Sequence, residues 1–216
     1  MIGAERHFDS REELAAALAG EVTEALRACL ASSGIATLAV SGGNTPTLFF
    51  DKLSDADLSW DKVTVTLVDE RMVPETSPRS NARLVRGHLL KGRAAAARFV
   101  ALDRPVAKSL RLDAVVLGMG SDGHTASFFP GGDTLAEALD PATSERIVEL
   151  KAPGAGETRM TFTLPALLAA KYLFLHIEGG EKQRTLMKAL VDGPVAAMPI
   201  RAVLRSERLV AIYWCP

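Results

Sequence analysis

The stretch LDAVVLGMGSDGHTASFFPGG, residues 112–132, decides the fold. Its first six residues are an apolar run with adjacent valines, which favours a strand buried on both faces of a parallel sheet. The run ends at Gly118 and Gly120, where glycines allow a sharp turn and leave backbone N–H groups open to a ligand. Asp122 and His124 add a carboxylate and an imidazole to the same turn. Because ligands of open α/β sheets bind at the carboxyl ends of strands, we expect chemistry here.

The glycines of this turn also match a dinucleotide-binding fingerprint. Gly118, Gly120 and Gly123 have the spacing G-x-G-x-x-G, which requires a helix directly after the turn. Pro130 and two following glycines leave room for about two helical turns at most. A Rossmann unit also usually opens its domain, whereas this turn lies past the midpoint of the chain. We therefore expect neither a nicotinamide nor a flavin cofactor.

The composition is that of a globular α/β protein. With 216 residues, 48% hydrophobic and 24% charged, the chain suits one domain over residues 1–216. The formal net charge of −1 gives no indication of nucleic-acid or anionic-membrane binding. No apolar run reaches the roughly 18–20 residues of a membrane span, and residues 1–10 do not resemble a signal peptide.

The cysteines and histidines give no sign of a metal site. Cys29 and Cys215 are far apart and are expected to be reduced thiols in a cytoplasmic protein. Neither they nor the four histidines have metal-ligand spacing, so no metal is expected.

The first part of the chain predicts a phosphate-binding turn. A capping box at residues 10–13 opens an amphipathic helix that ends near Gly34, and residues 35–40 form a buried strand. The turn SGGNTP, residues 41–46, then leads into a helix. Free N–H groups at Gly42 and Gly43 and the hydroxyls of Ser41 and Thr45 suit an anion. Because the Walker A spacing and its lysine are absent, a tight turn without a ligand remains the alternative.

Three charged residues end the next strand. Residues 63–68 form an apolar strand followed by Asp69, Glu70 and Arg71. Their place at a strand's carboxyl end favours a functional role, and a salt-bridged strand end is the alternative.

The second half continues the alternation of strands and helices. Lys182 lies in the first turn of a predicted helix, where a cation is unfavourable for the helix dipole, and this hints at an anionic partner. An exposed lysine without a ligand is the alternative. Arg159 and Thr161 share one face of an extended segment. The predicted strands are residues 98–102, 112–117, 146–150, 159–163, 172–177 and 209–214, and the predicted helices are 81–91, 134–139, 164–170, 181–191 and 199–205.

Four strand ends therefore carry polar or glycine-rich sequences, at residues 41–43, 69–71, 118–124 and 178–182. Carboxyl ends of parallel strands meet at one edge of a sheet, so we expect one shared site with an anion-binding side and an acid–base side.

Several segments resemble the 6-phosphogluconolactonase family. They are SGGNTP (41–46), VDERMVP (68–74) with SNARLVRGHLL (80–90), LGMGSDGHTASFFPG (117–131), RMTFTLPAL (159–167) and the Gly-Gly-x-Lys of residues 179–182. The family shares an open, mainly parallel α/β fold with glucosamine-6-phosphate deaminase and ribose-5-phosphate isomerase. The resemblance implies hydrolysis of 6-phosphogluconolactone in the oxidative pentose phosphate pathway, without a metal or organic cofactor. It also implies sugar-phosphate binding at Gly42 and Gly43, with Arg71, Arg159 and Lys182 as candidate anion contacts.

Two departures refine the resemblance. Deaminases of this fold group have Asn-Glu-Pro after the histidine block, whereas residues 125–131 here have the lactonase form. The crossover at residues 103–111 is shorter than is usual in the family, which leaves open how that side of the sheet is covered.

The expected mechanism is general-base hydrolysis. His124 activates a water, Asp122 orients its ring, and either Arg71 or the N–H groups of the glycine turn stabilise the oxyanion. Ser41 lies in no G-x-S-x-G elbow, which argues against a serine nucleophile. His7 and His176 are expected to have only packing roles. The catalytic group is His124, Asp122 and Arg71, and the expected substrate or phosphate contacts are Ser41, Gly42, Gly43, Thr45, Asp69, Glu70, Gly118, Gly120, Gly123, Arg159 and Lys182.

Two rival functions are an isomerase or deaminase of the same fold and a non-catalytic sugar-phosphate sensor. The missing Asn-Glu-Pro argues against the first, and the lack of a helix-turn-helix extension argues against the second. The expected partner is a small sugar-phosphate lactone, and the oligomeric state is left open.

Overall fold

A seven-stranded parallel sheet forms the centre of the computed structural model, which describes residues 2–103 and 105–216. The strand order is β1-β10-β9-β6-β2-β3-β5, and each neighbouring pair is parallel. This confirms the predicted open, mainly parallel sheet. The strands are β1 (Ile2–His7), β2 (Ala36–Val40), β3 (Val63–Leu67), β5 (Arg98–Val100), β6 (Ala114–Leu117), β9 (Tyr172–Glu178) and β10 (Val210–Cys215).

A second, three-stranded antiparallel sheet was not predicted. It has the order β4-β8-β7, with strands β4 (Asp69–Arg71), β7 (Ile147–Leu150) and β8 (Arg159–Phe162). The charged residues after β3 thus form a short strand of their own. Val68 joins the two sheets, since its N–H donates to the Val40 carbonyl at 2.9 Å while its own carbonyl accepts from the Phe162 N–H at 3.0 Å.

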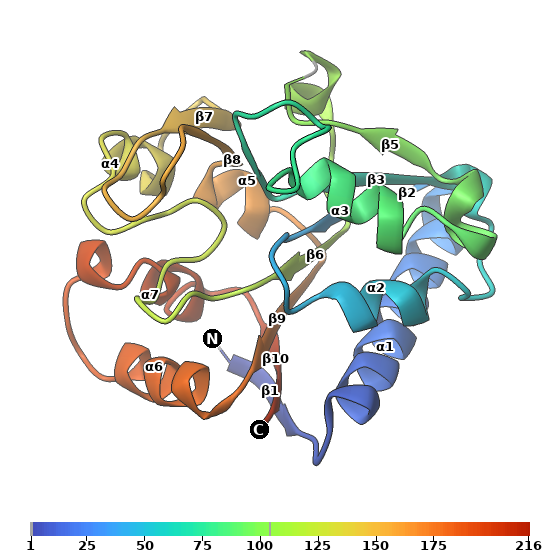
Figure 1. Ribbon diagram of the computed structural model, residues 1–216, viewed down its shortest axis with the longest axis horizontal. Helices are drawn as coiled ribbons and strands as arrows, with labels where there is room; N and C mark the ends of the chain where they lie inside the picture. Colours follow the sequence, from blue (N-terminus) through green and yellow to red (C-terminus); the bar gives the residue numbers. More distant parts are fainter. Residues whose placement is uncertain (1, 104) are drawn as a thin grey trace.

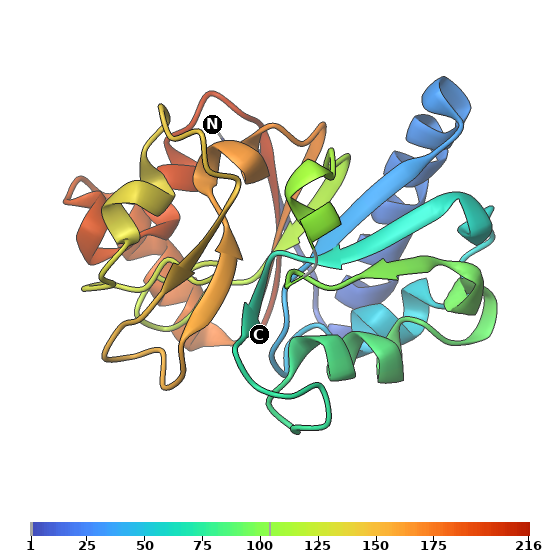
Figure 2. The same ribbon diagram turned by 90° about the horizontal axis from the view of Figure 1, so that it is seen from above.

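Helices lie on both sides of the central strands β6 and β9. Figure 2 shows α1, α2 and α3 on one side and α4 to α7 with the small sheet on the other. The helices are α1 (Arg11–Ser33), α2 (Thr47–Leu53), α3 (Asn81–His88), α4 (Leu135–Leu139), α5 (Leu164–Leu168), α6 (Gly180–Leu190) and α7 (Ile200–Leu204), labelled in Figure 1. Short 3₁₀ helices are η1 (Trp60–Lys62), η2 (Gly92–Ala96), η3 (Pro105–Ser109) and η4 (Val195–Ala197).

Helix α1 has the ends that the sequence predicts. The Ser10 hydroxyl accepts from the Glu13 N–H at 3.2 Å, and the Glu13 carboxylate accepts from the Asp9 N–H at 3.3 Å. Gly34 ends the helix with φ of +78°, a left-handed conformation that favours glycine. One face, including Leu14, is buried against the sheet.

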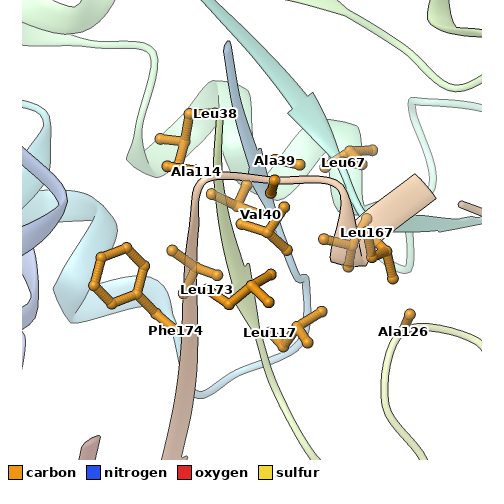
Figure 3. Packing of buried hydrophobic residues seen from close by; sticks show 14 of the residues in the cluster. Leu38, Ala39, Val40, Leu67, Ala114, Leu117, Ala126, Leu167, Leu173 and Phe174 are labelled. Atoms are coloured by element: carbon orange, nitrogen blue, oxygen red, sulfur yellow. The ribbon is translucent and has the colours of Figure 1, made fainter. Parts of the chain in front are cut away.

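The core lies around the central strands because they carry apolar side chains on both faces. Every residue of β2 and of β6 is buried. In Figure 3 the labelled side chains of β2, β6 and β9 gather in one cluster, with Leu67 of β3 and Leu167 of α5 beside it. This packing holds the ends of four strands in a fixed arrangement.

One strand of the main sheet was not predicted, and the described part of the short crossover contains only a brief helix. Strand β1 was missed, because residues 3–7 are exposed at the edge of the sheet and have no apolar face for a pattern to reveal. The short crossover at residues 103–111 contains η3, whose Ala107 is fully buried, and residue 104 lies outside the described part. Among the helices described, none combines the length and apolarity needed to cross a membrane.

Candidate active site

A cavity of about 300 Å³ opens where the four strand ends meet. The loops after β2 and β6 line it together with strands β4, β8 and β9 and the first turn of α6. Among the residues expected at the site, those on its wall are Ser41, Gly42, Gly43, Thr45, Asp69, Arg71, Gly118, Gly120, His124, Arg159 and Lys182. Asp122, Glu70 and Gly123 are not among the lining residues.

The turn at residues 41–46 forms one side of the cavity. The Ser41 hydroxyl accepts from the Gly118 N–H at 2.9 Å, which ties this turn to the one after β6. Gly42 packs against Asn81 so closely that a Cβ on it would lie 1.9 Å from the Asn81 Oδ1. The N–H groups of residues 42–45 have no acceptor within the described chain. They are therefore available to an anion in the cavity.

Lys182 extends from α6 to the same turn. Its Nζ donates to the Thr45 hydroxyl at 3.0 Å. Burial lowers the pKa of Lys182 from its ordinary value, while the charges of Glu178 and Glu181 act in the opposite direction. A partly buried ammonium beside unpaired N–H groups makes this side of the cavity attractive to an anion.

His124 and Asp122 form a close pair on another side of the cavity. The His124 Nδ1 lies 2.6 Å from the Asp122 Oδ1, and the His124 N–H donates to the same oxygen at 3.0 Å. Burial raises the pKa of Asp122, but the hydrogen bonds from His124 outweigh it and hold that pKa below its usual value. Since an ionised carboxylate only accepts, Nδ1 carries the hydrogen and Nε2 is left as the basic nitrogen.

Glycines make room for this pair. A Cβ on Gly120 would lie 2.2 Å from the His124 ring and 2.7 Å from the Asp122 Oδ1. Gly123 has φ of +82°, which favours glycine. The ring of Phe129 stacks on His124 with a centroid distance of 4.2 Å. The sequence prediction did not include this contact, since nothing in the spacing of residues 124 and 129 indicates stacking.

The small antiparallel sheet brings two arginines together. Arg71 of β4 is the register partner of Arg159 of β8. Burial lowers the pKa of Arg159, and the charge of Arg71 adds to this effect while Asp69 opposes it. Like charges opposite one another on neighbouring strands are unfavourable, so the pair favours an anionic ligand.

Asp69 lies near both Arg159 and Ser127 of the loop that follows β6. Its Oδ2 accepts from the Ser127 hydroxyl at 2.6 Å and lies 3.9 Å from the Arg159 Nη1. The Arg159 guanidinium itself donates to the Ala155 carbonyl and lies 5.3 Å from the centroid of the Phe129 ring. Buried Ser127 thus fixes the orientation of a carboxylate on the cavity wall.

Glu70 has a different environment from its neighbours. Its carboxylate accepts from the N–H groups of Asn81 and Ala82, at 2.8 and 2.7 Å, and from the Ser80 hydroxyl at 3.1 Å. These contacts satisfy the free N–H groups at the start of α3. Both carboxylate oxygens are therefore engaged with the helix, and Glu70 as a substrate contact remains a prediction.

Some lining residues escaped the sequence-based prediction. They include Asn44, Asn81, Met119, Ala126, Phe129 and His176. None of these side chains stands in a sequence spacing that indicates a binding site, so the sequence offered no reason to select them. Asn81 lies in the SNARLVRGHLL segment, which was the one available signal. The described residues contain no group of three or more His, Cys, Asp or Glu side chains arranged to hold a metal ion.

The fold and the cavity together define a class. The strand ends of this parallel α/β sheet carry an anion-binding turn, partly buried cations and a carboxylate–imidazole pair. This combination is typical of an enzyme that acts on small anionic molecules.

Comparisons with known proteins identify the family. Residues 9–214 match the family model described as glucosamine-6-phosphate isomerases/6-phosphogluconolactonase. A 6-phosphogluconolactonase of Rhizobium meliloti is 51% identical, over 97% of this chain and 97% of its own, and that of Pseudomonas aeruginosa is 43% identical, over 97% and 93%. The crystal structure of a 6-phosphogluconolactonase from Shewanella baltica superposes with a TM-score of 0.94 at 36% identity, covering 99% of this chain and 97% of that one. The chain belongs to this family, which confirms the resemblance seen in its sequence.

Proposed function

We propose that the protein is a 6-phosphogluconolactonase that opens 6-phospho-D-glucono-1,5-lactone to 6-phosphogluconate, with His124 as general base. The substrate follows from relatives of that name that match the chain over nearly their whole length. The observation that carries the mechanism is the 2.6 Å contact between His124 Nδ1 and Asp122 Oδ1. It gives the base a defined tautomer at the wall of a cavity that also holds an anion-binding turn.

The lactone is an ester, so its hydrolysis needs an activated water. Nε2 of His124 takes a proton as the water oxygen attacks the lactone carbonyl, and the Asp122 carboxylate stabilises the imidazolium that forms. The tetrahedral intermediate then collapses with cleavage of the bond between the carbonyl carbon and the ring oxygen. His124 returns its proton to that oxygen, which becomes a hydroxyl of the product.

The oxyanion of the intermediate needs a hydrogen-bond donor. The N–H groups of Gly118, Gly120 and Gly123 already donate, to the Ser41 hydroxyl and to the carbonyls of His124 and Gly120 respectively. By contrast, the Arg71 Nε is buried and has no partner among the described residues. Of the two donors that the sequence left open, this favours Arg71.

The phosphate group is proposed to bind on the side of the turn at residues 42–45. The unpaired N–H groups there and the Lys182 ammonium support this placement. Arg159, the register partner of Arg71 on the adjacent strand, is the second proposed anion contact. No step of the mechanism uses a metal or an organic cofactor, and cytoplasmic location remains a prediction.

The test is hydrolysis of freshly generated 6-phosphogluconolactone, corrected for spontaneous opening, by wild type and His124→Ala. We expect the substitution to lower kcat by roughly 10²–10⁴, the usual worth of an acid–base group. His88→Ala is the matched control, because His88 pairs with Asp51 at 3.1 Å and does not line the cavity. An unchanged kcat in His124→Ala removes His124 as the base.

The same preparations test the rival functions. Release of ammonia from glucosamine 6-phosphate indicates a deaminase, and tight binding of sugar phosphates without turnover indicates a sensor. Activity that survives chelation and dialysis supports the absence of a metal from the reaction, and activity lost on chelation contradicts it.

A further inference from the structure

A second histidine lies on the wall of the cavity and takes no part in the mechanism above. His176 of β9 is only 2% exposed, yet it is one of the residues that line the cavity, together with Lys182 and the turn at residues 42–46. On the α2 side it meets the edge of Phe49, with a centroid distance of 6.1 Å. A buried imidazole at this position needs polar partners for both of its nitrogens.

Only one ring nitrogen of His176 has such a partner. Nε2 lies 3.0 Å from the Glu178 Oε1, and the other Glu178 oxygen lies 3.1 Å from the Arg11 Nε. The Nδ1 is buried and has no partner within the described chain. Because Glu178 holds Nε2, the Nδ1 edge is the polar edge that remains for a ligand in the cavity.

The charges around His176 and Glu178 favour a protonated His176 ring when an anion binds in the cavity. In the neutral ring Nε2 carries the hydrogen, because the Glu178 carboxylate only accepts, so Nδ1 can donate only after protonation. A phosphate dianion has no hydrogen to give, whereas an imidazolium donates from both nitrogens, to the phosphate and to Glu178.

We propose that His176 is a phosphoryl-contact residue that takes up a proton when a phosphomonoester binds and donates from Nδ1 to a phosphate oxygen, with Glu178 and Arg11 holding the other side of the ring. This deepens the proposed function, since it assigns a further residue to the phosphate side of the same cavity. It replaces the packing role expected of His176 from the sequence.

Two basic and two weakly acidic side chains surround the pair. Lys182 from α6, whose pKa burial lowers, and Arg11 from α1 are the basic groups near the Glu178 carboxylate, so loss of the uptake in a His176 variant is what assigns the proton to the histidine. On β10, burial raises the pKa of Cys215 to about 11 and that of Tyr213 to about 12, so both are neutral at pH 8. Strand β6 carries only apolar side chains.

The test is calorimetric titration of 6-phosphogluconate at pH 8 in two buffers of different ionisation enthalpy, with gluconate as the unphosphorylated comparison. At this pH a phosphomonoester is a dianion and an ordinary imidazole is neutral. Wild type is expected to take up close to one proton per phosphomonoester bound. His176→Asn is expected to lose that uptake and to bind about 10- to 100-fold more weakly, as befits one charge-assisted hydrogen bond.

Two further variants make the result decisive. Glu178→Gln keeps an acceptor for Nε2 without its charge, so its affinity should fall at pH 8 and recover towards pH 6. This variant carries the test if His176→Asn does not fold. His7→Asn is the matched control, because His7 pairs with Glu5 at 2.8 Å outside the cavity, and it should bind as wild type does.

The outcomes separate this inference from the proposed function. Folded His176→Asn that keeps wild-type affinity, or wild type that binds without proton uptake, overturns the role of His176 whether or not the protein hydrolyses the lactone. If His176→Asn loses phosphate-dependent binding while the wild type does not hydrolyse the lactone, the phosphate contact of His176 is supported and the proposed lactonase function is contradicted. If wild type does not distinguish 6-phosphogluconate from gluconate, the phosphate contact of His176 is overturned, and the hydrolysis assay alone then decides the proposed function.

Discussion

The absence of a side chain at Gly120 should matter directly to the rate, and Gly120→Ala tests this. The new Cβ would lie 2.2 Å from the ring of His124, whereas ordinary contact begins at 3.4 Å, so the ring has to move by about 1.2 Å. The same Cβ would lie 2.7 Å from the Asp122 carboxylate. The Gly120 backbone does not have a positive φ, so alanine fits the backbone and the disturbance falls on the catalytic pair.

The expected loss follows from this displacement. A misplacement of about 1 Å in a catalytic group costs about 10²-fold in rate, so kcat should fall by roughly that factor. Stability should change little, because alanine reduces the freedom of the unfolded chain by about 0.4–1 kcal/mol and offsets part of the strain. Gly20→Ala is the matched control: Gly20 lies on the exposed side of α1 with no atom within 4 Å of a new Cβ, and we expect normal kcat there.

The assay compares initial rates of lactone opening for Gly120→Ala, His124→Ala and the double variant. If the glycine acts through the His124 ring, its substitution should cost nothing further once that ring is gone. A full 10²-fold loss in the His124→Ala background would show that Gly120 acts on something else. A wild-type kcat in Gly120→Ala would refute the placement of the base.

Three further predictions concern single groups. Lys182→Ala should raise KM about tenfold or more with little change in kcat, measured in the same lactone assay, and a lowered kcat at unchanged KM would contradict a pure phosphate contact. Contact with His124 lowers the pKa of Asp122, so its carboxylate contributes stability above about pH 4 that is lost as the pH falls through the folded-state pKa. In Asp122→Asn, the free energy of unfolding measured in urea should therefore depend less on pH over that acidic range. Identical pH profiles for wild type and variant would argue against the His124–Asp122 contact. Ser127→Ala should cost about 1–3 kcal/mol in urea unfolding, because it leaves a lone pair of buried Asp69 without its donor, and a change below 0.5 kcal/mol would mean that water replaces the hydroxyl.

Much of the main sheet was predictable because its signals are local. Strands β2 and β6 are unbroken apolar runs, α1 has a capping box and a terminal glycine, and each can be read within a window of a few residues. The carboxyl ends of parallel strands then place the turns at Gly42 and Gly120 at one edge without further information. The position of the cavity follows from these facts alone.

Contacts between distant parts of the chain could not be read in this way. Strand β1 is an exposed edge strand, and its one partner among the described strands is β10 at the other end of the chain. The same holds for the ring of Phe129 on His124 and for the hydroxyl of Ser127 on Asp69, since both depend on how a loop turns. His176 illustrates the limit most clearly, because within an apolar strand a packing role is the natural interpretation.

The small antiparallel sheet explains why the charged residues after β3 resisted interpretation. From the sequence, the position of Asp69 to Arg71 favours a functional role, and a salt-bridged strand end remains the alternative. Pairing with β8 instead sets Arg71 against Arg159, whose burial already disfavours its charge. Folding thus places two cationic residues side by side on adjacent strands at the cavity wall, and Asp69 lies 3.9 Å from the Arg159 guanidinium. Two like charges on adjacent strands repel each other until an anion lies between them, so under the proposed function this repulsion is relieved when the sugar phosphate binds and adds to its affinity.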